Sequence, residues 1–509
     1  MPYCLTSERR EQASDFVSRF DPRFWTVNFP RPAMAAVTAI AADALRVDAV
    51  FGRRGDLVGV IWEAVDRHDH PLLAYETARD FRGCRLAFRW RSSGVVALDQ
   101  VDGAVLTVEG RDAGGAAFTA YLRLWNYATG SGEDAAVSLD FADVRSGFGA
   151  GGPAVWMGDV DRMFVSLAPP GYVAGSEAAF ATPVEGWAEL SAMRCDGPGA
   201  VLAIGDILVP PHGLGIATGY DDCYHLTPAR VLRQALQLGY RGSINHYVGM
   251  SHYPRLAGPS TGSGRMEVVT SGDPLNAPCA AWHRAFAAEA ALLGFDVIWS
   301  LSFELFDDYC PAAWKQRAAD GAPALTGWVP PSTLLSPASA EAMGYLHAVA
   351  ATFLQIGAAA GLAPKFQIGE PWWWVRADGS PCLYDAAAVA AFAPVAIASV
   401  RSAMSATQNA TLDAAGACLA AACAGCAMRR GRRHRDAWCI CWRICRRCST
   451  RPRPRSGART CRWGGRARPT MCCSSRITTG RRRATRRRVR RGWRRSRRGS
   501  AIRRASSMI

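Results

Sequence analysis

The feature that most constrains the fold is a fourfold alternation of apolar strands and helices. It runs from about residue 214 to residue 405, and each predicted strand precedes a predicted helix. Thr227 can cap the first helix, with Pro228 at its first position. Repeated strand–helix units predict a parallel sheet covered by helices. The predicted strands span 214–222, 243–251, 296–306 and 365–375, and the predicted helices span 227–240, 279–295, 336–362 and 383–405.

Two long segments follow the second and third predicted strands, over residues 252–278 and 307–335. Both leave the carboxyl ends of their strands, which is where a (β/α)8 barrel places its ligand site. We therefore predict a TIM barrel over residues 206–426, of which the chain contains only the first half.

The preceding residues have a different pattern. Between about residue 50 and residue 205, short segments such as "RLAFRW", "AVLTV" and "TAYLRLWNY" alternate apolar and polar side chains. Glycine, aspartate and proline separate them. Because this period of two is typical of antiparallel sandwiches, we assign residues 1–205 to an N-terminal β-sandwich domain, which makes the protein multidomain.

From residue 427 the composition changes abruptly. Residues 427–509 hold 30 arginines but one acidic residue, Asp436, so the formal charge of +17 arises there and the rest of the chain is net acidic. A basic tail of this kind often binds nucleic acid. Its four clustered cysteines resemble a metal knuckle, but no clean second pair follows. We predict no metal site and no cofactor; the cysteines are Cys439, Cys441, Cys445 and Cys448.

The genetic code offers another explanation of this tail. Residues 438–442 can be written as codons and read again in a frame that starts at the third base of each codon. This offset frame encodes Val, then Tyr or His, then Leu or Met, and then Leu. The same offset gives Val-Leu at 471–473 and can give Tyr-Asp-Trp at 477–480. These pieces are typical of buried parallel strands. We therefore interpret residues 427–509 as the product of a frameshift between about Met404 and Met428, expect them to be disordered, and predict no nucleic-acid partner.

Other signals concern cell compartment and redox state. No N-terminal export signal and no run of about 18 apolar residues is present, so we expect a soluble protein with no membrane partner. Seven cysteines are scattered singly through the first 400 residues and predict free core thiols rather than a disulfide framework.

Carboxylates gather at the predicted strand ends. Glu370 ends the fourth strand, Glu304 ends the third with Asp307 and Asp308 just beyond, and Asp221 ends the first with its neighbour Asp222. Glycoside hydrolysis needs one protonated carboxylic acid and one ionised carboxylate. Glu370 is therefore the candidate acid/base and Glu304 a weaker catalytic candidate. A solvated barrel rim explains the same carboxylates without catalysis.

Further side chains are candidates for substrate binding. Trp372 and Trp373 follow Glu370 directly and could stack on sugar rings or simply pack the rim, and Asn245 and His246 lie on the second strand. A neutral, hydrogen-bonded histidine at a strand end is the alternative for His246. The predicted substrate-binding residues are Trp372, Trp373, Asp221, Asp222, Asn245 and His246.

Four segments carry a resemblance to a known family: "NHYVGMSHY", "SLSFELFDDYCPAAWKQR", "TGWVPPSTLLSP" and "PKFQIGEPWWWV". Here the chain resembles the TIM-barrel domain of the bacteriophage or prophage non-contractile tail sheath proteins, and its sandwich resembles their N-terminal domain. The resemblance covers about residues 1–415. It implies a structural tail protein that forms homo-oligomers, contacts other tail proteins and resides in the virion tail after assembly in the bacterial cytoplasm.

The barrel is also similar to clan A glycoside hydrolases, whose acid/base glutamate lies in an Asn-Glu-Pro motif at the end of strand 4. Glu370 and Pro371 match that motif, but Gly369 replaces the asparagine. The clan's nucleophile ends strand 7, which this chain does not encode in its present frame. The favoured hypothesis is thus a non-catalytic tail protein with carbohydrate as a further ligand, and the alternative is a glycoside hydrolase that uses Glu370.

Overall fold

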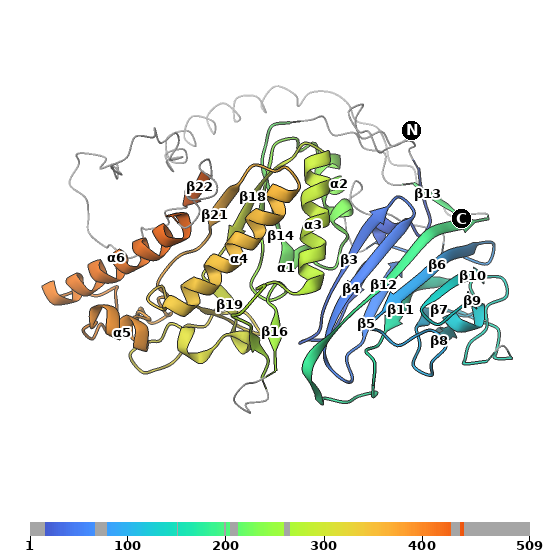
Figure 1. Ribbon diagram of the computed structural model, residues 1–509, viewed down its shortest axis with the longest axis horizontal. Helices are drawn as coiled ribbons and strands as arrows, with labels where there is room; N and C mark the ends of the chain where they lie inside the picture. The colour runs from blue at the N-terminus through green and yellow to red at the C-terminus, as the bar shows by residue number, and fades with distance from the viewer. Residues whose placement is uncertain are drawn as a thin grey trace, which may run out of the picture. The chain divides into compact units, whose positions relative to one another are not determined.

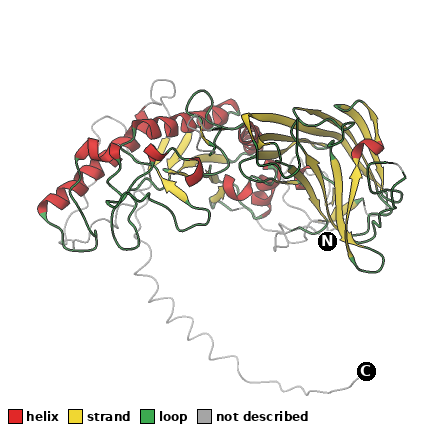
Figure 2. Cartoon of the chain, turned by 90° about the horizontal axis from the view of Figure 1, so that it is seen from below, coloured by secondary structure: helices red, strands yellow, loops and turns green. Residues whose placement is uncertain are grey.

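The computed structural model describes residues 16–66, 79–149, 151–197, 200–203, 212–258, 265–428 and 438–441. These described residues belong to one compact unit. In its N-terminal part, two antiparallel sheets face each other (Figure 2), which confirms the predicted antiparallel architecture. The first sheet has the strand order β3(Met34–Ala41)-β4(Ala44–Arg53)-β12(Ala179–Asp196)-β6(Arg85–Ser93)-β10(Asp134–Asp140)-β9(Ala128–Gly130). The second sheet has the strand order β2(Thr26–Asn28)-β5(Val58–Glu63)-β11(Val160–Leu167)-β7(Val105–Arg111)-β8(Ala117–Arg123).

The alternating pattern explains why these strands form. In β6, every second side chain from Leu86 to Ser92 is buried, while the arginines between them are exposed. Trp62 of β5 and Trp90 of β6 are fully buried in the core between the sheets. A further short pair joins β1(Phe16–Ser18) to β13(Val201–Ala203). Burial of one face of each sheet is therefore what holds this domain together.

The second domain contains a parallel sheet whose strands follow chain order. The order is β14(Ile216–Gly219)-β15(Ser243–Tyr247)-β18(Asp296–Leu301)-β21(Lys365–Ile368)-β22(Trp438–Cys441). The four predicted strands are confirmed, though each is shorter than predicted. Among the described residues, β14 and β22 each pair with a single strand. Two small antiparallel pairs lie in the long segments, β16(Leu256–Ala257) with β17(Glu267–Val268) and β19(Glu304–Phe306) with β20(Ser332–Leu334).

Helices connect these strands and cover one face of the sheet. α2(Pro228–Gln237), α3(Ala277–Leu292) and α4(Ala340–Ala359) follow the first three strands, and Figure 1 shows α3 beside α4. Short helical turns are α1(Tyr220–Cys223), η1(Pro22–Phe24), η2(Leu124–Tyr127), η3(Asp307–Tyr309) and η4(Ala312–Trp314). The predicted cap is confirmed, since Thr227 Oγ1 accepts a hydrogen bond from the Arg230 amide at 3.2 Å. α4 is long and apolar enough to span a membrane, but its buried face packs against α3, β18 and β21.

Two predictions for the C-terminal region need correction. Within the predicted helix over 383–405, only α5(Ala386–Phe392) is helical; it ends at Ala393 with a φ of 42° before Pro394, and a separate helix, α6(Ala406–Met428), begins just after the predicted range. A residue before proline avoids the helical region, so the helix cannot continue there. The expectation that residues 427–509 are disordered is wrong for residues 427–428, which end α6, and for residues 438–441, which pair in parallel with β21. The remainder of that tail lies outside the described residues.

The sandwich and the sheet domain share contacts within this unit. α3 packs against β3 and β4, and Met34 belongs to the same apolar cluster as Trp282 of α3. Thr227 Oγ1 also donates to the Arg23 carbonyl at 2.6 Å. Near the loops after the parallel strands, Phe29 contacts His252 with ring centroids 5.9 Å apart. The two domains are therefore joined by both apolar and polar contacts.

Candidate functional site

Carboxylates from three parts of the chain gather at the carboxyl end of the parallel sheet. Asp221 lies in α1 just after β14, Glu304 begins β19 just after β18, and Glu370 follows β21 by two residues. The charge of Glu370 acts on Glu304, and all three charges act on Tyr247. Parallel strands bring their carboxyl ends to one edge, so the predicted grouping of Glu304 and Glu370 is found in the structure.

Glu304 has the environment of a proton donor. Its side chain is 5% exposed, and its Oε2 accepts a hydrogen bond from Ser332 Oγ at 3.0 Å. Burial raises the pKa of Glu304 to about 7, the bond from Ser332 opposes this, and the charge of Glu370 adds to it. A carboxyl group with this pKa is partly protonated at neutral pH, as general acid catalysis requires.

Glu370 is placed differently from Glu304. It is exposed, and its carboxylate makes no hydrogen bond or ion pair with the residues that the structure describes. Partial burial raises its pKa. Its φ of 52° is in the left-handed region, which costs a non-glycine residue roughly 1–2 kcal/mol. The backbone therefore turns this side chain out at the sheet edge without fixing its carboxylate.

Tyr247 is a member of the site that the sequence reasoning missed. Its hydroxyl shares a hydrogen bond of 2.7 Å with Ser302 Oγ. Burial raises the pKa of Tyr247 above its usual range, the bond to Ser302 opposes this, and the charges of Glu304, Asp221 and Glu370 add to it. The period of two along β15 could have identified it, because Tyr247 shares a face with Asn245.

Asp221 organises the loop after β15. Its Oδ2 accepts bonds from the Met250 amide at 2.8 Å and from the amide and hydroxyl of Ser251, and its Oδ1 accepts from His252 Nδ1 at 3.0 Å. Burial would raise the pKa of Asp221, but the His252 bond and charge and the bonds from Met250 and Ser251 outweigh it and lower the pKa. Its predicted substrate role remains a proposal, because these bonds occupy both oxygens.

We expect the Asp221→Ala substitution to lower the free energy of unfolding by about 3 kcal/mol, because it leaves buried amides without acceptors. The matched control is Asp222→Ala, since Asp222 is exposed on the same turn and its loss should change stability by no more than about 0.5 kcal/mol. Because the folded pKa of Asp221 is depressed, its contribution is present above about pH 4 and lost below it. Urea unfolding measures both variants, and equal stabilities would contradict the expectation.

Asn245 and His246 lie on opposite faces of β15. Asn245 Nδ2 donates to Gln367 Oε1, while its Oδ1 is buried with no hydrogen-bond partner among the described residues. His246 is fully buried and stacks on Trp282 of α3 with ring centroids 5.6 Å apart. The predicted binding role of His246 does not fit this position, because a one-residue step along a strand reverses the side chain's face. Asn245 remains a binding candidate.

The tryptophans after Glu370 are anchored by packing. Trp373 Nε1 donates to the Ala415 carbonyl at 2.8 Å, and its ring meets Phe392 edge-on. Trp372 packs against a small cluster that includes Leu334 and Cys382. These contacts match the rim-packing alternative, and a sugar-stacking role for Trp372 and Trp373 stays a prediction.

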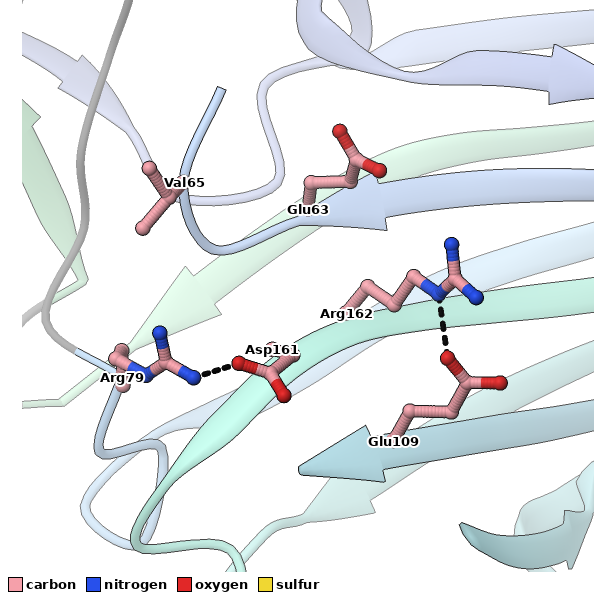
Figure 3. Close-up of a pocket in the computed structure, with 6 residues that line it drawn as sticks. All are labelled: Glu63, Val65, Arg79, Glu109, Asp161 and Arg162. Atoms are coloured by element: carbon pink, nitrogen blue, oxygen red, sulfur yellow. Dashed lines mark hydrogen bonds and ion pairs between the residues drawn. The ribbon is translucent and has the colours of Figure 1, made fainter. Parts of the chain in front are cut away.

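The charged cavity shown in Figure 3 lies elsewhere, on the sandwich. It has a volume of about 450 Å³, and Glu63, Val65, Arg79, Glu109, Asp161 and Arg162 line it. Arg162 Nε bonds Glu109 Oε2 and Arg79 pairs with Asp161 (Figure 3), so charges of both signs are already paired. Over the described residues, no group of three or more His, Cys, Asp or Glu side chains is arranged to hold a metal ion.

Comparison with known proteins gives two kinds of similarity. The chain is weakly similar to a GH31 alpha-xylosidase from Xanthomonas citri, at 10% identity and a TM-score of 0.23, over 84% of this chain and 44% of that one. It is also similar to a GH31 sulfoquinovosidase from E. rectale, at 10% identity and a TM-score of 0.24, over 84% and 62%. The chain thus spans less than two thirds of the length of these enzymes.

The sequence matches extend over most of the chain. Residues 17–205 match the non-contractile tail sheath N-terminal domain, and residues 210–437 match the non-contractile tail sheath protein TIM barrel. The second match passes residue 426, where we had placed the start of the tail. Both predicted domains of the family are present in the predicted order. The chain therefore belongs to the family of non-contractile tail sheath proteins.

Proposed function

We propose that this chain is a structural subunit of a phage or prophage tail and that its barrel domain does not cleave glycans. Family membership supports a tail component that assembles with other tail proteins as an oligomer. The observation that carries the non-catalytic part is the setting of Glu370: no described residue orients its carboxylate, and Gly369 replaces the asparagine of the glycosidase motif. A general acid must be held within hydrogen-bond reach of its target, so an unoriented carboxylate is a poor one.

The remaining parts of this proposal concern assembly. The subunit forms a homo-oligomer, contacts other tail proteins and is incorporated into the virion tail in the bacterial cytoplasm. It binds neither nucleic acid nor membrane, and carbohydrate is a further ligand at the sheet edge that carries Tyr247 and Asn245. The support for this ligand is the buried Asn245 Oδ1, which finds no hydrogen-bond partner in the described part of the chain and can accept a hydrogen bond from a sugar hydroxyl.

The domain boundaries belong to the same proposal. A sandwich over 1–205 precedes a barrel domain over 206–426, and residues 427–509 result from a shifted reading frame. α6 supports this division, because Leu419, Ala422 and Cys423 still pack against the apolar cluster of the barrel. Residues 438–441 lie where a fifth barrel strand belongs, and the offset frame encodes an apolar strand at that point. The residues that the offset frame encodes after this strand would supply the remaining strands and helices of the barrel.

Mass spectrometry of purified tail particles tests both parts. We expect peptides from the sandwich and from the barrel before residue 404, together with offset-frame peptides after residue 428. Absence of this protein from particles that contain tail tube protein would refute the structural role. Arginine-rich peptides from the present frame would refute the frameshift, which resequencing of the gene checks independently.

The alternative function is glycoside hydrolysis, with Glu370 as acid/base and Glu304 as its partner. The observation that favours it is the pKa of Glu304, about 7, beside a second carboxylate. It requires the Glu370→Gln variant to lose at least about 100-fold in rate on aryl glycosides. It also requires a rate that falls as the pH rises through 7, if Glu304 supplies the proton.

Our expectation is that the unaltered chain, Glu370→Gln and Glu304→Gln all hydrolyse aryl glycosides no faster than buffer. The matched control is Asp308→Asn, an exposed carboxylate of the same loop that pairs with Arg265 at 3.7 Å. A rate above background that only the two glutamate variants abolish would replace the structural proposal with the enzymatic one. The frame-restored chain provides the same test with a longer barrel.

A further inference from the structure

β8 forms an open edge of the sandwich. Among the strands that the structure describes, this seven-residue strand pairs only with β7, and the pairing covers its full length. At the other edge of the same sheet, by contrast, the Val27 amide of β2 donates to the His225 carbonyl at 3.0 Å. Soluble proteins usually protect a long edge with lysine, proline or a bulge, and β8 contains none of these. Such an edge is a template for a further strand.

Two residues of β8 offer their backbone groups to such a strand. The Tyr121 carbonyl accepts from the Gly147 amide at 2.7 Å, and the Tyr121 amide donates to Ser146 Oγ at 3.4 Å. Both backbone groups of Tyr121 therefore point away from β7. In an antiparallel pair every second residue points its backbone groups to the same side. The amides and carbonyls of Thr119 and Ala117 thus also point away from β7, and nothing in the described part of the chain bonds them.

Exposed aromatic residues stand at one end of this open segment. Tyr121 is 56% exposed, and Phe148, in the loop that bonds Tyr121, is 61% exposed. The Arg123 guanidinium lies over the Phe148 ring, 5.9 Å from the centroid, and its Nη2 donates to the carbonyls of Asp99 and Gln100 at 2.6 and 2.8 Å. The Phe148 ring is therefore held in place although it is exposed. Aromatic residues are enriched at protein interfaces, and a ring positioned in advance loses little entropy on binding.

The opposite end of the segment is complementary to this aromatic end. Residues 113–116, the turn before β8, consist of alanine and glycine only and are exposed. Asp112 begins that turn, and its Oδ1 accepts from the amides of residues 114 and 116. At the aromatic end, the exposed Arg145 directly precedes Ser146. One end of the edge is thus small and acidic and the other is aromatic and basic. A two-fold axis between the ends brings unlike ends together.

We propose that a second copy of this chain adds its β8 to the open edge, antiparallel, about a two-fold axis at Phe118. Ala117 of each copy then lies opposite the partner's Thr119, and these two residues exchange backbone hydrogen bonds in both directions. The two five-stranded sheets become one continuous sheet. Phe118, which is partly buried against the sandwich core, lies opposite the partner's Phe118. This inference rests on the proposed homo-oligomer and names the surface through which its subunits meet.

Sedimentation equilibrium of the full chain and its Thr119 variants measures this contact. We expect the unaltered chain to form a dimer that dissociates on dilution. Thr119→Pro removes an amide that β7 does not use, so the variant should fold but dimerise at least about tenfold more weakly. The matched control is Thr119→Val, which keeps the amide and suits a strand, and it should dimerise like the unaltered chain. Circular dichroism checks that each variant is folded.

Two further variants keep the test decisive. If Thr119→Pro does not fold, Thr119→Lys replaces it, because the two like charges meet near the axis and should weaken the dimer by a similar factor. The register is tested by mixing the Ala117→Cys chain with the Thr119→Cys chain under oxidising conditions. The mixture should give a disulfide that joins positions 117 and 119 of different copies. Neither variant alone should cross-link at these positions, because equivalent positions are diagonal and too far apart.

Several outcomes would overturn the proposal. The first is a full chain that stays monomeric at every concentration. The second is a folded Thr119→Pro or Thr119→Lys variant that dimerises as tightly as the unaltered chain, since the dimer would then use another surface. The third is a dimer in which the mixed cross-link between positions 117 and 119 does not form. None of these results bears on whether the chain belongs to tail particles, which the mass spectrometry of those particles decides separately.

Discussion

Replacing Trp299 with alanine is expected to lower the free energy of unfolding of the barrel domain by about 3–5 kcal/mol. Trp299 of β18 is 1% exposed. Its ring lies 5.5 Å from that of Phe353 in α4, and a Cβ built on Gly357 would lie 2.8 Å from its Nε1. The indole thus fills the space between the sheet and α4, and its removal leaves a cavity that a close-packed helix cannot fill.

Chemical denaturation followed by tryptophan fluorescence and circular dichroism measures this loss. The matched control is Trp328→Ala, since Trp328 is 71% exposed and its removal should change stability by no more than about 0.5 kcal/mol. A loss below about 1 kcal/mol for Trp299→Ala would mean that this layer is not close-packed.

The second prediction concerns acid. His246 and His283 are buried together behind the sheet, with their Nε2 atoms 3.2 Å apart. His283 Nδ1 faces the Cys279 carbonyl, which only accepts, so it carries a proton and leaves its Nε2 to accept from His246. His246 Nδ1 then accepts from the Thr218 hydroxyl at 2.9 Å. The bond between the two rings holds only if His283 is neutral, because a proton on its Nε2 would face the Nε2–H of His246.

Burial lowers the pKa of His283 to about 3, and burial and the charge of His283 lower the pKa of His246 well below its usual range. A base with a depressed folded pKa stabilises the fold above its unfolded pKa, about 6.5, and loses this contribution as the pH falls. Between pH 8 and pH 5 His283 should therefore remove about 2 kcal/mol from the free energy of unfolding, and His246 should act in the same direction.

Other buried groups change the free energy of unfolding in the opposite direction as the pH falls. The contribution of the histidines must therefore be measured by comparing the unaltered chain with a histidine variant. The raised pKa of Glu304 makes the fold more stable as the pH falls through 7. We therefore compare the unaltered chain with the His283→Gln variant, in which every carboxyl group is retained. The drop in the free energy of unfolding from pH 8 to pH 5 should be about 2 kcal/mol smaller in the variant. Equal drops would show that His283 is already protonated in the folded protein or that it never becomes charged on unfolding.

Local patterns predicted much of this fold. The strand–helix alternation predicted the parallel sheet, and Thr227 with Pro228 predicted the start of α2, because capping and apolar periodicity depend on residues a few positions apart. The helix expected over 383–405 was wrong because Pro394, which breaks it, was passed over within a run of alanines. The strand at 438–441 was predicted only for the offset frame, because the residues of the present frame alternate or cluster apolar side chains over no more than a few positions there.

The candidate site was only partly predictable. Parallel topology alone places Glu304 and Glu370 at one edge of the sheet, so their proximity could be predicted from strand order. The identity of the group with a pKa near 7 could not, because it depends on the burial of Glu304 and on Ser332, which comes from β20. Tyr247 and His246 point to opposite faces of β15, and which face each one takes depends on the register of the strand. A shift of the register by one residue would exchange the two faces.

The sequence by itself determined the classes of structure: an antiparallel N-terminal domain, a parallel strand–helix domain and a C-terminal segment of foreign composition. These follow from periodicity and composition, which short stretches of chain contain. Only the tertiary structure decided which side chains lose water and which meet across the chain, such as Trp373 with Ala415 and Asp221 with His252. Desolvation and contacts between distant residues arise when the chain packs, and no local stretch of the sequence specifies them.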